Sequence, residues 1–266
     1  MKLGTKAPQG DLSPHAGNPD FMLSLARGLR VIESFEAHPD GRSIVEISQA
    51  TGLSRAAIRR ILVTLELLGY AEHTRQVYRL KTQVLRLGFS FLSSSSVVEA
   101  ARPVLERITE QLHESSSMSM LDGPDIVYVA RSAASRILAA GLSVGSRLPA
   151  YCTSMGRVLL ASLPDDQLNT YLRGLTPRTF TPKTITRISE LKKSILEVRT
   201  LGYAIVDEEL EAGLRSIAVP VSTRNGQVVA AINVGTHVSR VDRTILLRKC
   251  LPALKKGARE LRTILI

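Results

Sequence analysis

The stretch from Ser43 to Gly69 restricts the fold most, because two helical patterns meet there at a tight turn. Ser43 can cap a short helix whose apolar face is Ile44, Ile47 and Ala50. Thr51-Gly52-Leu53 forms the turn, and Ser54 can cap a longer helix that ends near Leu68. The apolar stripe of this longer helix is Ile58, Ile61, Leu62, Leu65 and Leu68. Two helices joined by a turn that contains glycine predict a helix-turn-helix motif.

The residues on either side of this motif predict one more helix before it and a hairpin after it. A helix is expected from Phe21 to Phe35, with an apolar face of Leu25, Leu29, Ile32 and Phe35. Residues 70–80 alternate around Arg75-Gln76, which predicts a hairpin. The order helix, helix, turn, helix, hairpin predicts a winged helix-turn-helix domain over residues 21–81.

Basic side chains gather on the third helix and on the hairpin. In a helix-turn-helix, the recognition helix enters the major groove with its N-terminal residues against the base edges. Arginine pairs well there with guanine, and it binds phosphates elsewhere. A charged run is more often a solvated helix face, but its place inside this domain pattern favours DNA binding. The candidate DNA-binding residues are Ser54, Arg55, Ala56, Arg59, Arg60, Arg75 and Arg79.

The remainder of the chain predicts a connector and an α+β domain. Residues 82–114 have the pattern of two helices, which suit a rigid connector and a dimer contact. From residue 115 onward, strands interleave with helices, and Arg224-Asn225-Gly226 is a hairpin signal. This pattern predicts a largely antiparallel sheet within residues 115–266. The expected strands are 126–130, 204–206, 216–221 and 228–234, and the expected helices are 154–162, 164–173, 189–202 and 243–265.

Composition excludes several classes of protein. Apolar residues make up 44%, which suffices for a core, and the net charge of +11 suggests a polyanionic partner. Two cysteines, Cys152 and Cys250, are too few for a disulfide scaffold or a cysteine-rich zinc site. The protein is therefore expected in a reducing cytoplasm. No metal or cofactor is expected. The sequence contains no run of 18 uncharged apolar residues, so no membrane-spanning helix is predicted. Residues 1–20 are expected to be a disordered leader.

Two segments of the second half could hold a ligand. Thr153 and Ser154 begin a helix, and the N–H groups at a helix start can bind an anion, although an ordinary capped helix is commoner. The acidic run from Asp207 to Glu211 could bind metal or act in catalysis, but it is more often a solvated loop, and no histidine lies near it to complete a metal set.

Several motifs together resemble the IclR family of bacterial transcription regulators over about residues 21–266. They are Ser24 to Leu29, Leu53 to Leu62, Leu68-Gly69-Tyr70, the run from Val144 to Ala161, Asp207 to Val221, and Ala231 to Thr236. The resemblance implies a GAF-like effector-binding domain over 115–266, and a homodimer or a tetramer on a palindromic DNA operator. Whether the protein represses or activates stays open.

The resemblance also implies where an effector binds. Carried over position by position, the candidate residues are Ser154, Met155, Gly156, Arg157, Asp207, Ser216, Asn233 and Gly235. Some members have Cys at the position of Ser216 and Ser at those of Asn233 and Gly235, which suggests a different effector. The run from Gly145 to Arg157 is similar to the branch that controls aromatic-acid degradation through the β-ketoadipate pathway. That branch implies protocatechuate, 4-hydroxybenzoate or β-ketoadipate as the effector.

A serine hydrolase is the competing hypothesis. Gly141-Leu142-Ser143-Val144-Gly145 matches the G-x-S-x-G pattern, and Asp207 and His237 follow in the required order. That pattern needs a helix directly after the serine, whereas here a loop with Pro149 follows. No catalytic residue is therefore assigned.

Overall fold

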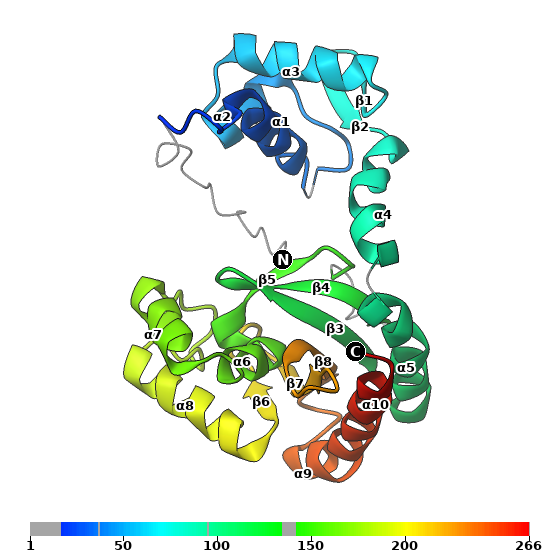
Figure 1. Cartoon of the computed structure of the whole chain (residues 1–266), viewed down its shortest axis with the longest axis vertical. Helices are drawn as coiled ribbons and strands as arrows, with labels where there is room; N and C mark the ends of the chain where they lie inside the picture. Colours follow the sequence, from blue (N-terminus) through cyan, green and yellow to red (C-terminus); the bar gives the residue numbers. More distant parts are fainter. Residues whose placement is uncertain (1–16, 37, 95, 135–141, 266) are drawn as a thin grey trace. The chain divides into compact units, whose positions relative to one another are not determined.

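The computed structural model describes residues 17–36, 38–94, 96–134 and 142–265. The chain divides into two compact units, Met1–Phe91 and Leu92–Ile266 (Figure 1). Residues 1–16, most of the expected leader, lie outside the described residues. Within the part that is described, every helix is too short or too polar to cross a membrane.

The first unit contains a helix-turn-helix followed by a two-stranded wing, as predicted. Its elements are α1 (Leu23–Glu33), α2 (Ile44–Thr51), α3 (Arg55–Leu67), β1 (Ala71–Thr74) and β2 (Val77–Leu80). Ser43 and Glu46 form a reciprocal capping box at the start of α2. Gly52 ends α2 with a φ of 71°, a left-handed conformation that glycine adopts without steric cost. The turn into α3 is therefore encoded locally.

The predicted apolar face of the first helix packs on the core only at its C-terminal end. Phe35 is buried and Ile32 packs on the same core, as expected, whereas Leu25 and Leu29 are 58% and 48% exposed. Val31 is buried beside them, because successive helical residues are about 100° apart and Val31 lies next to the predicted stripe. Leu68, which directly follows α3, is also exposed. The apolar stripe on the outside of α1 is free for another contact.

The second unit is built on a six-stranded antiparallel sheet in the order β5-β4-β3-β8-β7-β6. The strands are β3 (Ser115–Asp122), β4 (Asp125–Ser132), β5 (Arg147–Pro149), β6 (Ala204–Asp207), β7 (Leu214–Ser222) and β8 (Val228–His237). The predicted hairpin at Asn225-Gly226 joins β7 to β8. The α+β class and the antiparallel sheet are therefore confirmed.

Helices cover both faces of this sheet (Figure 1). One face packs on α5 (Ser96–Leu112) and α10 (Leu251–Ile264), and the other on α6 (Ser154–Ala161) and α8 (Ile188–Leu201). The remaining helical segments are η2 (Thr82–Val84), α4 (Leu85–Ser94), η4 (Ala150–Cys152), α7 (Asp165–Gly174), α9 (Arg243–Ile245) and a π-helical turn, η5 (Leu246–Cys250). We call the side of the sheet toward α6 the effector face.

Three features of the second unit differ from expectation. β3 was not predicted, because its Ser-Ser-Ser-Met-Ser-Met run lacks the β-branched and aromatic residues typical of strands. The short β5 was not predicted either. The division between units falls inside α4, and α5, expected as part of a connector, packs on the sheet through Ala101, Leu105 and Ile108.

Candidate DNA-binding and effector-binding sites

The recognition helix α3 has a buried face and a basic exposed face. Ile58 and Leu62 lie in the core of the first unit. The Ser54 hydroxyl accepts a hydrogen bond from the Ala57 N–H and caps the helix. The N-terminal turn of α3 is therefore capped and exposed to solvent. Its exposed candidates are Arg55, Ala56, Arg59 and Arg60.

The wing holds Arg75 at its tip in a strained turn. Arg75 and Gln76 have φ values of 48° and 68°, so both residues of this two-residue hairpin loop are left-handed. Such loops favour Asn-Gly, because residues with larger side chains adopt this conformation at a steric cost. Arg42 pairs with Tyr78 through two backbone hydrogen bonds of 2.9 Å and braces the wing. Arg79 lies half-buried on β2.

In the second unit, the start of α6 is buried against the sheet. The Thr153 hydroxyl accepts a hydrogen bond from the Gly156 N–H, so this N–H is already bonded within the protein. A Cβ on Gly156 would lie 2.1 Å from the Ala150 carbonyl oxygen. Gly156 therefore allows η4 and α6 to pack closely, and the open N–H that the sequence suggested at this position is not available. Met155 is buried, and its sulfur accepts a hydrogen bond from the Ser119 hydroxyl at 3.2 Å.

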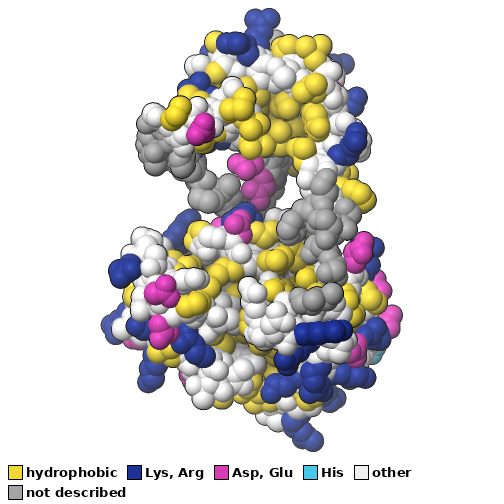
Figure 2. Space-filling model, viewed as in Figure 1, with side chains coloured by type: hydrophobic (Ala, Val, Ile, Leu, Met, Phe, Trp, Pro, Cys, Tyr) yellow, Lys and Arg dark blue, Asp and Glu magenta, His cyan; other side chains and the backbone are white. Residues whose placement is uncertain are grey.

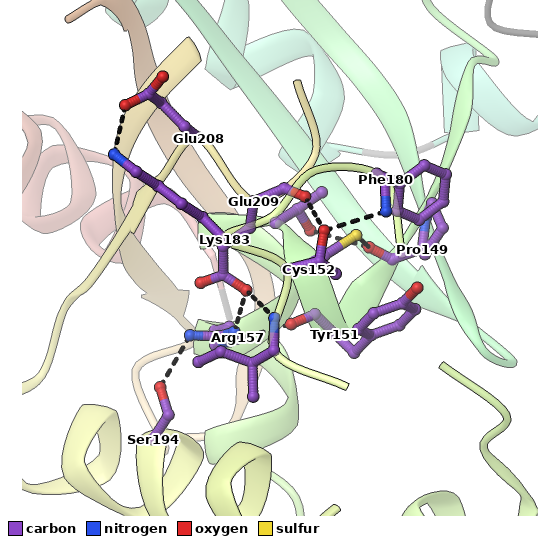
Figure 3. A network of polar contacts seen from close by, with 12 residues as sticks. Pro149, Tyr151, Cys152, Arg157, Phe180, Lys183, Ser194, Glu208 and Glu209 are labelled. Carbon is purple, nitrogen blue, oxygen red and sulfur yellow. Dashed lines mark hydrogen bonds and ion pairs between the residues drawn. The ribbon is translucent and has the colours of Figure 1, made fainter. Parts of the chain in front are cut away.

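Arg157 lies in a buried polar network rather than beside open space (Figure 3). Its guanidinium donates to Glu209 at 2.6 Å, to the Ser194 hydroxyl at 2.8 Å and to the Tyr151 carbonyl at 2.9 Å. The side chains of Arg157 and Glu209 are only 3% and 8% exposed. The positive charge of Arg157 is thus balanced within the protein. This pairing favours a role for Arg157 in holding α6 in place, and its expected role as an effector ligand stays a prediction.

The loop after β6 is tied to the same network. Thr181 and Thr184 donate from their hydroxyls to the Glu208 and Glu209 carbonyls at 2.6 Å. Lys183 pairs with the Glu208 carboxylate at 2.5 Å and lowers the pKa of that carboxyl. The acidic run therefore fixes two loops against α6. Within the described residues, no cluster suited to a metal ion occurs.

Asp207 is also paired within the protein. Its two carboxylate oxygens accept hydrogen bonds from Arg215 at 2.9 and 3.0 Å, and this pairing lowers the pKa of the Asp207 carboxyl. The two residues lie opposite each other on β6 and β7. The carboxylate of Asp207 thus already has a cationic partner, which favours a supporting role over contact with an anionic ligand.

Three further candidates lie on β7 and β8. Ser216 is directly opposite Gly235, and Asn233 is opposite Ala218. Asn233 is 8% exposed, and its Oδ1 atom has no hydrogen-bond partner among the described residues. The Ser154 hydroxyl, 1% exposed at the start of α6, has no such partner either. A buried polar atom left unpaired costs free energy, so these two atoms mark a place for a ligand or water.

Residues of β3 and β4 on the effector face were not among the predicted site residues. Ser117 lies opposite Asn233, and Ser119 lies opposite Ala231. Tyr128 on β4 is buried and lies opposite Ser119. The alternation of serine with methionine from Ser117 to Met120 was the signal available, and it is weak because serine is not enriched in strands.

The residues of the hydrolase hypothesis have other hydrogen-bond partners. Gly141 lies outside the described residues. Ser143 bonds to Ser146 in a turn before β5, Asp207 bonds to Arg215, and His237 bonds to Ser239. A catalytic triad needs its serine, histidine and acid joined to one another. The described hydrogen bonds therefore do not form that arrangement.

Comparison with known proteins identifies the family. The pattern for the IclR helix-turn-helix domain matches residues 24–75, and that for the C-terminal domain of the bacterial transcriptional regulator IclR matches residues 89–263. The chain belongs to the IclR family. It is therefore a DNA-binding transcriptional regulator and not an enzyme, and the winged helix-turn-helix prediction is confirmed.

Individual relatives place this IclR-family chain near regulators of aromatic catabolism. The Pca regulon regulatory protein of Pseudomonas putida is 47% identical over 256 residues, which cover 96% of this chain and 88% of the relative. A crystal structure from Rhodococcus sp. RHA1 has a TM-score of 0.82 and 47% identity, covering 92% of this chain and 98% of that one. The PobR inducer-binding domain from Acinetobacter, a double mutant in complex with 3-hydroxybenzoic acid, has a TM-score of 0.59 and 33% identity, covering 62% and 96%.

Proposed function

We propose that this regulator controls genes of aromatic-acid catabolism and that its effector is a small acid of that pathway. The observation that carries the proposal is the 47% identity, over nearly the whole chain, with the Pca regulon regulatory protein. The candidate effectors are protocatechuate, 4-hydroxybenzoate and β-ketoadipate. The regulator would act in the cytoplasm, where bacterial DNA lies.

The exposed basic face of the first unit supports the proposed DNA contacts. The N-terminal turn of α3 would read base edges, while the wing would bind the backbone beside it. The proposed contacts are Ser54, Arg55, Ala56, Arg59, Arg60, Arg75 and Arg79.

A homodimer on a palindromic operator is part of the proposal. Met22, Leu25 and Leu29 form an exposed apolar stripe on and just before α1. Figure 2 shows hydrophobic side chains gathered on this unit around α1. A stripe of this kind supports pairing of two first units, which would place two α3 helices about one DNA turn, roughly 34 Å, apart.

Fluorescence anisotropy with DNA flanking the gene tests the regulator and its effector together. The labelled duplex is titrated with the full chain at two salt concentrations, with and without each acid. We expect salt-dependent binding that exceeds binding to random DNA, and that shifts with one acid. A duplex with only one half-site is expected to bind much more weakly than the palindrome. Specific binding that no acid changes would contradict the effector proposal.

Arg59→Ala is expected to weaken operator binding roughly 5- to 100-fold, the loss typical of one arginine contact to a base or a phosphate. The matched control is Arg187→Ala, which removes an exposed arginine of the second unit. The affinity for the effector should stay unchanged in both variants. Equal operator affinity of Arg59→Ala and the control, at fixed salt, would show that α3 is wrongly oriented in the proposal.

Substitutions in the wing turn are expected to change the stability of the first unit and its operator affinity independently. Gln76→Gly removes the steric cost of one left-handed residue and should stabilise the first unit by about 1 kcal/mol, while operator affinity is retained. Arg75→Asn combined with Gln76→Gly should stabilise it at least as much, yet weaken operator binding. Thermal unfolding and anisotropy measure the two effects. Equal operator affinity of the two variants would exclude Arg75 as a contact.

A further inference from the structure

A β-bulge in β4 sets the direction of one arginine. Ser117 lies opposite Arg131 and Met118 lies opposite Ala130, but Ser119 lies opposite Tyr128, so Val129 is an extra residue. Val129 and Ala130 both pack in the core between the sheet, α5 and α10. Simple alternation from Tyr128 would direct Arg131 toward α5. The bulge instead places Arg131 on the effector face, together with Tyr128.

Arg131 begins a row of opposed residues that crosses the effector face. The row runs from Arg131 on β4 through Ser117 on β3 to Asn233 on β8 and Ala218 on β7. Arg131 and Asn233 are therefore two strand spacings apart, roughly 10 Å between their backbones. The residues between and beyond them are small. One aromatic ring suits the span between the two polar side chains.

Among the buried and half-buried arginines that the structure describes in the second unit, Arg131 alone lacks an acidic partner. Arg157, Arg215 and Arg147 pair with Glu209, with Asp207, and with Asp122 and Asp125, respectively. Arg131 is half-buried, and no ion pair or hydrogen bond of its side chain to another described residue occurs. A partly buried guanidinium without an anion is unfavourable, and a bidentate carboxylate would satisfy it.

The surroundings of Arg131 favour a ligand with one carboxylate and one hydroxyl. Burial raises the pKa of Tyr128, beside Arg131, to about 12, so this phenol is neutral at neutral pH and competes little for the guanidinium. Two strands away along the row, Asn233 presents an acceptor oxygen that lacks a donor among the described residues. A phenolic O–H supplies such a donor, whereas a second carboxylate supplies only acceptors.

We infer that Arg131 binds the carboxylate of the effector and that Asn233 accepts a hydrogen bond from its ring hydroxyl. The ligand class is thus a hydroxybenzoate rather than an open-chain dicarboxylate. This inference rests on the proposed function, because it assumes an acid effector. It assigns the anion-binding role to Arg131, not to Arg157.

The test is isothermal titration calorimetry of the full chain with 4-hydroxybenzoate and with its neutral analogue 4-hydroxybenzamide. The wild type should bind the acid at least 10-fold more tightly than the amide. Arg131→Gln should weaken binding of the acid roughly 10- to 100-fold and binding of the amide much less, so that the preference disappears. Arg131→Lys should retain part of the preference, because it keeps the charge but loses the bidentate geometry. Arg187→Gln, which alters an exposed arginine, is the matched control.

A second ligand pair tests the role of Asn233. Asn233→Ala should weaken binding of 4-hydroxybenzoate about 5- to 10-fold and leave binding of benzoate unchanged. A purely structural role of Asn233 would weaken binding of both ligands equally. Operator binding by each variant, measured without ligand, shows that the chain is folded.

The outcomes separate this inference from the proposed function. If the wild type bound none of the candidate acids, the proposed effector class would be wrong. If it bound 4-hydroxybenzoate while Arg131→Gln and Arg131→Lys kept the full preference for the acid over the amide, the assignment of Arg131 alone would be overturned. Tight binding of β-ketoadipate without binding of either hydroxybenzoate would overturn the ligand class.

Discussion

Glu209→Leu is expected to lower the free energy of unfolding of the second unit by about 3–5 kcal/mol at pH 7. The substitution leaves the guanidinium of Arg157, 3% exposed, without its anion. It also removes the acceptor for the Ile185 N–H. Arginine cannot shed its proton, so the charge stays buried and uncompensated. Urea unfolding of the full chain, followed by far-UV circular dichroism, measures the loss.

Glu190→Leu is the matched control, because Glu190 forms an exposed ion pair with Arg187 on the same unit. Surface pairs contribute little, so this change should alter the free energy of unfolding by no more than about 0.5 kcal/mol. If Glu209→Leu unfolded at the same urea concentration as Glu190→Leu, the buried pair would not support the domain.

Arg157→Met should cost less than Glu209→Leu, because a buried carboxyl can take up a proton. Burial already raises the pKa of Glu209 above its ordinary value, in spite of the neighbouring Arg157. Without Arg157 the pKa rises further, so the folded protein keeps a proton that the unfolded chain has lost. Measured relative to the wild type, the free energy of unfolding of this variant should therefore be highest below the ordinary carboxyl pKa, about 4.3, and fall as pH rises toward neutrality. Thermal unfolding between pH 4 and 8 follows this trend, and a flat profile would argue against it.

Gly156→Ala is expected to destabilise the second unit by about 3 kcal/mol or more, at the upper end of what overpacking costs. The added Cβ would lie 2.1 Å from the Ala150 oxygen and 2.4 Å from its Cα. These atoms belong to the backbone of η4, so no side-chain rotation relieves the clash. The two segments would have to separate, and the buried start of α6 would open.

Gly174→Ala controls for the general effect of replacing a helical glycine. Gly174 ends α7, and a Cβ there meets no atom within 4 Å. Alanine should stabilise this helix by about 0.5–1 kcal/mol, since it has the better helix propensity. The two variants should therefore shift the urea midpoint of the second unit in opposite directions. If both variants shifted the midpoint in the same direction, the backbone of η4 would be able to move away from the added Cβ at little cost, which would contradict the prediction.

Local structure is predictable from the sequence where neighbouring residues encode it. The serine cap of α3, the glycine turn before it and the hairpin signal at Asn225-Gly226 each depend on a few consecutive residues. β3 could not be predicted in this way, because its serine-rich run has no strong strand preference. It is held in the sheet by β4 and β8 on either side. Strand formation there depends on pairing with distant segments rather than on local propensity.

The candidate effector site likewise contains residues that the sequence predicts and residues that only the structure reveals. Asn233 was singled out from the sequence, and the structure leaves its Oδ1 atom buried and without a partner among the described residues. Arg157 was singled out as well, yet its anion, Glu209, lies 52 residues away along the chain. Nothing in the local sequence marks that pairing. Arg131 was not predicted as a site residue, because only the bulge in β4 directs it to the effector face.

By itself, the sequence determined the helix-turn-helix and its wing, the order of most strands and helices, and the family. Helix periodicity, caps and turns act within a few residues, so they can be found without the fold. The tertiary structure alone decided that Gly156 is a packing position, that Arg157 is balanced within the protein, and that Arg131 shares a face with Asn233. Each of these depends on which distant segments meet and in which register, and a one-residue bulge is enough to turn a side chain to the opposite face of a sheet.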